Sequence, residues 1–238
     1  ALVTGHYVRR VEGKAGPELH RGNDHSKDQS YFLFSTTRGQ LAYLDFPLGG
    51  MDKAETRRHA ERFGLLVAEK PESQDICFVP NGDYSGLLEK IRPGGWEPGD
   101  IVDVDGNRLG GHDGIVHFTV GQRRRLGIAT GEALYVIRIE PKTRNVVVGP
   151  REALFRRSIS VSEVNWLGDG EIPNGNREVQ VKIRSTAEPV AASICSREGG
   201  LLDVTFAEPV EGTSPGQAAV FYQGERVLGG GWITSDIF

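Results

Sequence analysis

The chain has 238 residues, a formal net charge of −4, 38% hydrophobic residues and 25% charged residues, which is typical of a globular protein in water. Its two cysteines are too few for a secreted disulfide scaffold and lack the spacing of a zinc site, and no apolar run approaches the roughly 20 residues of a membrane span. We therefore expect a cytoplasmic protein of two or three domains with no membrane partner. The slight negative charge, taken alone, argues against a nucleic-acid partner, because phosphate binding favours a basic surface.

Residues 1–82 predict a mixed α/β region. The opening ALVTGHYV is apolar and rich in β-formers, which predicts a buried strand, and SKDQSYFLFS predicts the start of a short helix.

The clearest predicted helix lies in GGMDKAETRRHAERFGLL. Asp52 can cap its first turn, and Glu55 three residues later completes a capping box. Gly64 suits the left-handed position that ends many helices, and Ala60 and Phe63 are predicted to face inward.

The pattern changes to period two after a turn-rich boundary near residues 83–98. Residues 83–152 predict a small central β domain, with a hairpin around Asp105-Gly106 and strands in GIVHFTVG, ALYVIRIEP and NVVVGP. From residue 153 to 238, short strands separated by turns predict a β-barrel, so the fold is mostly β overall.

The two cysteines occupy different contexts. Cys195 is expected to lie on a strand as a small buried hydrophobe, whereas Cys77 in SQDICFV lies in a polar segment where a thiol could be reached. Local context alone leaves Cys77 open between a structural and a reactive role. A cysteine hydrolase would also need a histidine base, and no motif ties any of the six histidines to Cys77.

Several strings together resemble one family. TGHYVR, SKDQSYFL, FPLGGMDKAETRRHAERFGL, SQDICFV, the region around VGQRRRLGIA, LYVIRIEPKTRNVVVGP, VNWLG and PGQAAVFYQGERVLGGGWI follow one another as in the tRNA-specific 2-thiouridylases, the MnmA/TrmU family. An older label for this family is tRNA (5-methylaminomethyl-2-thiouridylate) methyltransferase.

The resemblance implies a PP-loop ATP-pyrophosphatase domain, a central β domain and a C-terminal tRNA-binding β-barrel. We expect residues 1–82 to be the C-terminal part of the first domain, 83–152 the central domain and 153–238 the barrel. Neither the S-G-G-x-D-S phosphate loop nor the first cysteine of the family's pair occurs in these 238 residues. The expectation is therefore a remnant of the PP-loop domain, in a chain that by itself binds no cofactor and does not thiolate tRNA.

The implied reaction belongs to the full-length enzyme. With ATP and Mg²⁺ it adenylates the C2 oxygen of the wobble uridine (position 34), and a cysteine persulfide then delivers sulfur. The implied partners are tRNA, through its anticodon stem-loop, and a sulfur donor such as a cysteine desulfurase or sulfur-relay protein.

The resemblance also implies roles for single residues. Cys77 matches the persulfide-carrying cysteine, and Gly5 matches a position that lines the ATP site. The positions matching tRNA contacts are His6, Lys27, Asp28, Gln29, Arg184, Ser185 and Gln217.

Two positions depart from the family pattern. Ser185 stands where an aromatic Tyr is usual, so a base-stacking contact is missing there, and Arg125 stands where Gly is usual in GQRRRLG. The alternative hypothesis is a non-catalytic tRNA- or RNA-binding β module without sulfur chemistry.

Overall fold

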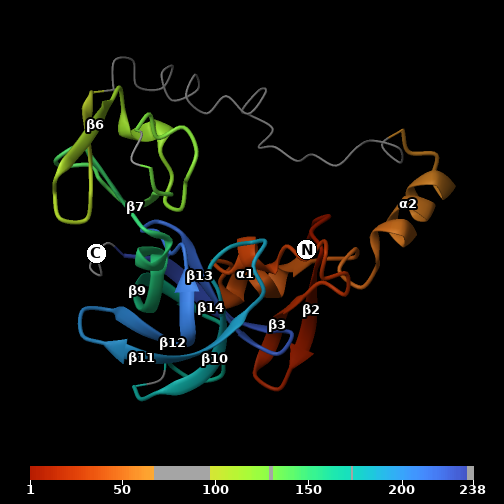
Figure 1. Cartoon of the computed structure of the whole chain (residues 1–238). Coiled ribbons are helices and arrows are strands. Elements are labelled where there is room, and N and C mark those ends of the chain that lie inside the picture. The colour runs from red at the N-terminus through yellow and green to blue at the C-terminus, as the bar shows by residue number, and fades with distance from the viewer. Residues whose placement is uncertain (67–96, 129–130, 173, 235–238) are drawn as a thin grey trace. The chain divides into compact units, whose positions relative to one another are not determined.

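The computed structural model describes residues 1–66, 97–128, 131–172 and 174–234 (Figure 1). Its elements are mostly β-strands, as predicted, with few helices. The chain forms two compact units: one combines the first segment with residues 157–209 and those from 215 onward, and the other holds residues 97–156 with 210–214. No helix among the described residues is long and apolar enough to cross a membrane.

The first unit is built on a closed ring of six strands. They are β9 (Phe155–Trp166), β10 (Arg177–Lys182), β11 (Val190–Arg197), β12 (Leu201–Glu211), β13 (Ala218–Gln223) and β14 (Arg226–Ile233). The hydrogen-bonded order is β13-β10-β11-β12-β9-β14, and the pairing of β14 with β13 closes the ring. The predicted barrel is confirmed, and closure leaves these six strands without a free edge.

Strand β13 is buried along almost its whole length, from Ala218 to Tyr222. A barrel strand normally buries alternate residues, so a second layer must cover the outer face of β13. Val8, Leu19 and Leu41 of the first segment supply that layer, because they form one core cluster with Ala218, Val220 and Tyr222.

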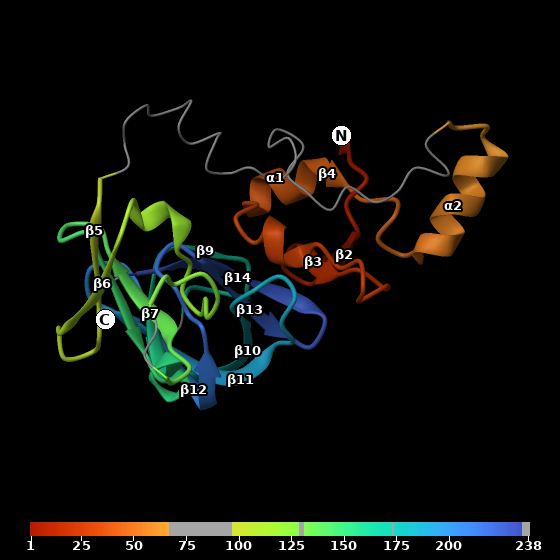
Figure 2. The same ribbon diagram turned by 45° about the horizontal axis from the view of Figure 1, so that its top comes forward.

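The covering segment contains a hairpin that extends the barrel sheet. The strands of this segment are β1 (Leu2–Val3), β2 (Val8–Gly13), β3 (Gly16–Arg21) and β4 (Leu44–Asp45). Its helices are the 3-10 turn η1 (Ser30–Leu33), α1 (Arg38–Tyr43) and α2 (Lys53–Arg62). β3 pairs with both β2 and β14, and α1 packs beside β3 (Figure 2). The expected buried strand at the start is wrong, since β1 has two residues and Leu2 and Val3 are more than half exposed.

Helix α2 begins and ends where predicted, but the predicted capping box is wrong, because in the described structure the Glu55 side chain accepts no hydrogen bond from the Asp52 amide. The Asp52 carboxylate accepts a hydrogen bond from the Glu55 amide at 2.7 Å, and Gly64 adopts a left-handed φ of +64°. The prediction that Phe63 faces inward is wrong, because its ring is 66% exposed and α2 buries none of its residues.

The second unit contains a four-stranded sheet. Its strands are β5 (Gly99–Val102), β6 (Arg108–His112), β7 (Tyr135–Glu140) and β8 (Asn145–Gly149), in the order β6-β5-β8-β7 with β5 parallel to β8. The predicted hairpin is confirmed, with Gly106 at φ +87° between β5 and β6. The predicted strand in GIVHFTVG is wrong: Ile115–His117 form a 3-10 turn, η3, and Arg151–Leu154 form another, η4.

Candidate nucleic-acid interface

A buried ion pair holds the loop that carries Lys27, Asp28 and Gln29. The Asp28 carboxylate is 1% exposed and accepts a hydrogen bond from Nε of Arg21, itself 8% exposed, at 3.0 Å. The same carboxylate accepts from the Gly22 and Ser30 amides and from the Ser30 hydroxyl. Asp28 therefore uses its hydrogen-bonding capacity inside the protein, and it fixes the loop between β3 and η1.

Gln29 joins this loop to the segment that carries His6. Its side-chain oxygen accepts a hydrogen bond from the Tyr7 backbone amide at 2.9 Å. Its backbone amide donates a hydrogen bond to the Tyr7 carbonyl at 3.1 Å. His6 is half-buried beside this pair, with Nδ1 against the Thr4 hydroxyl. Two segments about twenty residues apart in the sequence thus become neighbours.

Tyr31 joins the loop to the barrel. Its hydroxyl lies 3.2 Å from the Ile183 carbonyl and 3.0 Å from the Ala218 carbonyl, and it donates its single proton to these two acceptors. Ile183 directly precedes Arg184 and Ser185, and Ala218 directly follows Gln217. One phenol therefore ties the loop to the two barrel segments that carry the residues assigned to tRNA.

Charged and phenolic groups are buried beneath these positions. Burial lowers the pKa of the Lys182 ammonium, while the Asp28 carboxylate acts in the opposite direction. Burial also raises the pKa of Tyr222, whose hydroxyl lies 3.1 Å from that of Ser30. Beneath the site, Arg21 and Lys182 thus lie close to the Asp28 carboxylate, and Glu188 also acts on Lys182.

The structure gathers the residues assigned to tRNA in one unit, with unequal access. Arg184 is exposed, and the half-buried ones are His6, Lys27, Gln29, Ser185 and Gln217. Only the Asp28 side chain is closed to a ligand. Sequence reasoning missed Arg21, Tyr31 and Lys182, because nothing local marks a residue on a strand or short turn as buried against a distant partner.

The two cysteines and Gly5 complete the predicted set. Cys77 lies outside the described residues. Cys195 is on strand β11 as predicted, but the prediction that it is buried is wrong: it is half-buried, with its thiol 3.6 Å from the Ser196 carbonyl. Gly5 is exposed, and a Cβ added there would make ordinary contact with Leu48 at 3.6 Å.

The described residues do not fit a nucleotide or its metal ion. Gly5 alone is assigned to ATP, and its backbone has no close approach that a side chain would block. Within the described ranges, no group of three or more His, Cys, Asp or Glu side chains could hold a metal ion. We therefore derive no catalytic step through ATP or Mg²⁺.

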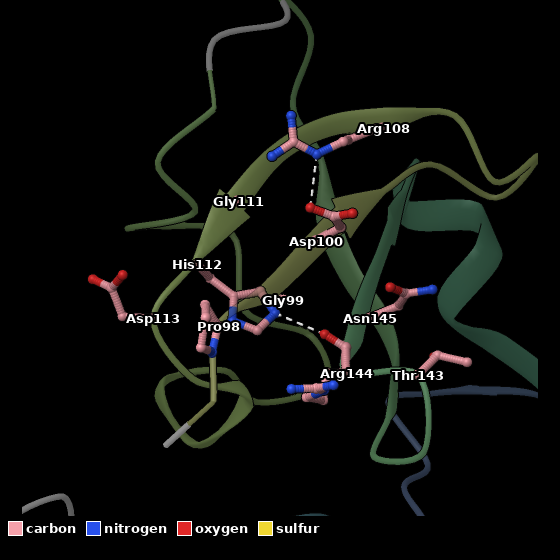
Figure 3. Close-up of a pocket in the computed structure, with 10 residues that line it drawn as sticks. All are labelled: Pro98, Gly99, Asp100, Arg108, Gly111, His112, Asp113, Thr143, Arg144 and Asn145. Carbon is pink, nitrogen blue, oxygen red and sulfur yellow. Dashed lines mark hydrogen bonds and ion pairs between the residues drawn. The ribbon is translucent and has the colours of Figure 1, made fainter. Parts of the chain in front are cut away.

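The second unit has an open polar pocket of about 510 Å³ between the β5–β6 edge and the β7–β8 turn (Figure 3). His112 Nε2 lies 3.0 Å from the Arg144 carbonyl, and its Nδ1 accepts a hydrogen bond from the Gly114 amide at 3.1 Å, so both ring nitrogens are used inside the protein. Arg108 pairs with Asp100 at 2.7 Å, and Arg144 pairs with Glu97 at 2.5 Å. Since carboxylates satisfy both arginines, the described residues of this pocket offer no free cation for an anionic ligand.

Three family models match consecutive parts of the chain. Residues 1–81 match a "tRNA methyl transferase HUP domain", residues 87–150 a "tRNA methyl transferase PRC-barrel domain" and residues 156–233 an "Aminomethyltransferase beta-barrel domain". Together they account for nearly the whole chain.

Full-length relatives agree with these models. The chain is 56% identical over 236 residues to a protein of Rickettsia felis named tRNA-specific 2-thiouridylase MnmA, a match covering 99% of this chain and 65% of that protein. Proteins of the same name from Rhodospirillum centenum and Paracoccus denitrificans are 57% and 55% identical, each over 98% of this chain and 61% of their own length. The chain thus spans less than two thirds of these relatives.

Proposed function

Because this chain belongs to the family of tRNA-specific 2-thiouridylases, we propose that it acts in the replacement of the C2 oxygen of the tRNA wobble uridine by sulfur. The activity is that of a tRNA-uridine 2-sulfurtransferase. The observation that carries the proposal is the ordered match of three family models together with 54–57% identity to the 2-thiouridylases over almost the entire chain.

The proposal assigns tRNA binding to the first unit. Lys27 and Arg184 supply cations for phosphate groups, while Gln29 and Gln217 supply amides for base or sugar edges. The hydrogen bonds of Gln29 to Tyr7 and of Tyr31 to the barrel support this assignment, since they hold these side chains in one region. His6 and Ser185 join this set by resemblance.

Asp28 has a different role in this proposal. Its carboxylate is buried and fully engaged, so it acts on tRNA through the loop that it positions and makes no contact itself. Residues 1–82 are proposed as part of the PP-loop domain, 83–152 as the central domain and 153–238 as the barrel.

Cys77 is the proposed sulfur carrier. The outer sulfur of a persulfide is nucleophilic and would attack the activated C2, so that the C2 oxygen leaves with its activating group. A second thiol would then cleave the S–S bond, which leaves one sulfur on the uridine and a disulfide on the protein. The proposed donor is a cysteine desulfurase or a sulfur-relay protein, and ATP would activate the uridine in the complete reaction.

Two measurements on the 238-residue protein test this function. Fluorescence anisotropy with an unmodified tRNA transcript that carries a wobble uridine should show binding, and Arg184→Gln should weaken it. Mass spectrometry after incubation with a cysteine desulfurase and cysteine should show one added sulfur on the Cys77 peptide, with Cys77→Ala as the control. Absence of tRNA binding would overturn the proposal, whereas tRNA binding without sulfur on Cys77 would favour a non-catalytic RNA-binding module.

A further inference from the structure

The turn that carries Arg123, Arg124 and Arg125 in the second unit is held firmly in place. Gly121 donates to the Val136 carbonyl at 2.8 Å, and Val136 donates back to the Gln122 carbonyl at 2.9 Å, which joins the turn to β7. Leu126, at its far end, is buried in the core of the unit.

The side chain of Gln122 closes the turn internally. Its oxygen accepts from the Thr119 amide at 3.0 Å, and its nitrogen donates to the Arg124 carbonyl at 2.9 Å. The backbone under the arginines is therefore organised before any ligand arrives, which reduces the entropy cost of binding.

All three arginines are exposed, and among the described residues none forms an ion pair. The ion-paired arginines of this unit show the contrast. Each of them meets a carboxylate: Arg108 with Asp100, Arg138 with Glu140, Arg144 with Glu97 and Arg151 with Glu211. Carboxylates of the unit thus neutralise these four isolated arginines, whereas the three consecutive arginines can bind an external anion.

Arg125 also occupies a backbone conformation that disfavours a side chain. Its φ is +61°, in the left-handed region where glycine is the residue of least strain. The chain therefore carries an arginine at a position where the backbone favours glycine. A third cation at this position is consistent with a role in binding an anion.

We propose that the arginine turn, residues 121–126, is a second RNA-binding surface that grips the phosphodiester backbone of the tRNA. Guanidinium groups match phosphate oxygens in pairs, and the described residues that line the pocket of Arg123 and Arg125 include no aromatic side chain for base stacking. This pocket has a volume of about 420 Å³, and its lining also includes the apolar side chains of Leu126 and Leu134. Glu132 also lines this pocket, where Arg123 and Arg125 outnumber it by two to one.

This inference rests on the proposed function, since it needs tRNA as the ligand. It predicts binding without base specificity, because contacts to phosphates fix the position of a nucleic acid and carry no sequence information. The surface should therefore contribute equally to the binding of tRNAs with different anticodons.

The test measures tRNA affinity of the 238-residue protein at several salt concentrations. Each phosphate that a variant no longer neutralises should reduce the slope of log K against log salt by about 0.7–0.9, so replacing all three arginines should reduce it by about 2 to 3 and weaken binding roughly tenfold or more. The variants are Arg125→Gly alone and Arg123→Gln/Arg124→Gln/Arg125→Gly together.

The Arg125→Gly variant distinguishes a loss of tRNA binding from a loss of protein stability. Glycine suits φ +61°, so this variant should melt at the same or a higher temperature while its salt slope falls by about 0.7–0.9. The matched control is Arg108→Gln, which removes an exposed arginine of the same unit that already has a carboxylate partner, and which should leave the slope unchanged.

The outcomes are distinguishable. If the wild-type protein binds tRNA and the triple variant keeps its affinity and slope, the inference fails and the proposed function stands. The inference also fails if Arg108→Gln reduces the slope as much as Arg125→Gly, because the slope would then depend on the net charge of the protein and not on a phosphate contact at the arginine turn. A wild-type protein that binds no tRNA overturns both.

Discussion

Replacing Asp28 by Asn should destabilise the first unit, because it breaks the buried ion pair beneath the candidate interface. The amide keeps one oxygen for the Gly22 and Ser30 amides, but it places an NH₂ group where Arg21 now donates at 3.0 Å. The guanidinium of Arg21, 8% exposed, would lose its carboxylate and face a second donor. Lys182, whose ammonium is held in part by the Asp28 charge, would lose that stabilisation as well.

The magnitude follows from burial. Breaking a buried ion pair by removing one partner typically destabilises a protein by about 3–5 kcal/mol, because the remaining charge stays desolvated. For a chain of this size, 1 kcal/mol lowers the melting temperature by about 2–4 °C, so Asp28→Asn should lower it by roughly 6–20 °C. The free energy of unfolding in urea, followed by circular dichroism, measures the same change.

Glu12→Gln provides the control on the neighbouring hairpin. Glu12 is 68% exposed in its pair with Arg10, and exposed pairs contribute about 0–1 kcal/mol. If Asp28→Asn is no less stable than Glu12→Gln, the positioning role is wrong. A folded Asp28→Asn protein of normal stability that loses tRNA affinity would instead make Asp28 a direct contact.

Three other changes test single features. Gly49→Ala should destabilise the protein by about 2–3 kcal/mol in thermal melts, because its Cβ would fall within 1.7 Å of the Val8 carbonyl oxygen, whereas Gly50→Ala has no atom within 4 Å and should be nearly neutral. Burial raises the pKa of Tyr222, so the folded protein keeps this proton where the unfolded chain has released it, and stability should fall as the pH rises above about 10. Urea unfolding of Tyr222→Phe should lack that part of the decline, about 1.4 kcal/mol per pH unit, and an unchanged pH dependence would contradict the assignment. Tyr31→Phe should lose about 1 kcal/mol of stability and bind tRNA more weakly at a temperature where both proteins are folded; equal binding would show that the tie to the barrel does not position the site.

The sequence by itself determined the local elements and the resemblance to the 2-thiouridylases. Alternating apolar residues predicted the strands of both β regions, Asp105-Gly106 predicted a hairpin, and Asp52 and Gly64 predicted both ends of α2. These signals are local, since helix caps and hairpin turns depend on residues only a few positions apart in the sequence. The strand prediction for GIVHFTVG is wrong because a run of apolar residues this short is compatible with either a strand or a helical turn.

Only the tertiary structure decided what each polar residue of the site does. Lys27, Asp28 and Gln29 are consecutive, yet Asp28 is buried against Arg21 while Gln29 joins Tyr7. Ring closure between β13 and β14, and the covering of β13 by the first segment, bring partners nearly two hundred residues apart into contact, as Ser30 and Tyr222 show. Burial depends on such distant partners, and the sequence around a residue does not contain them.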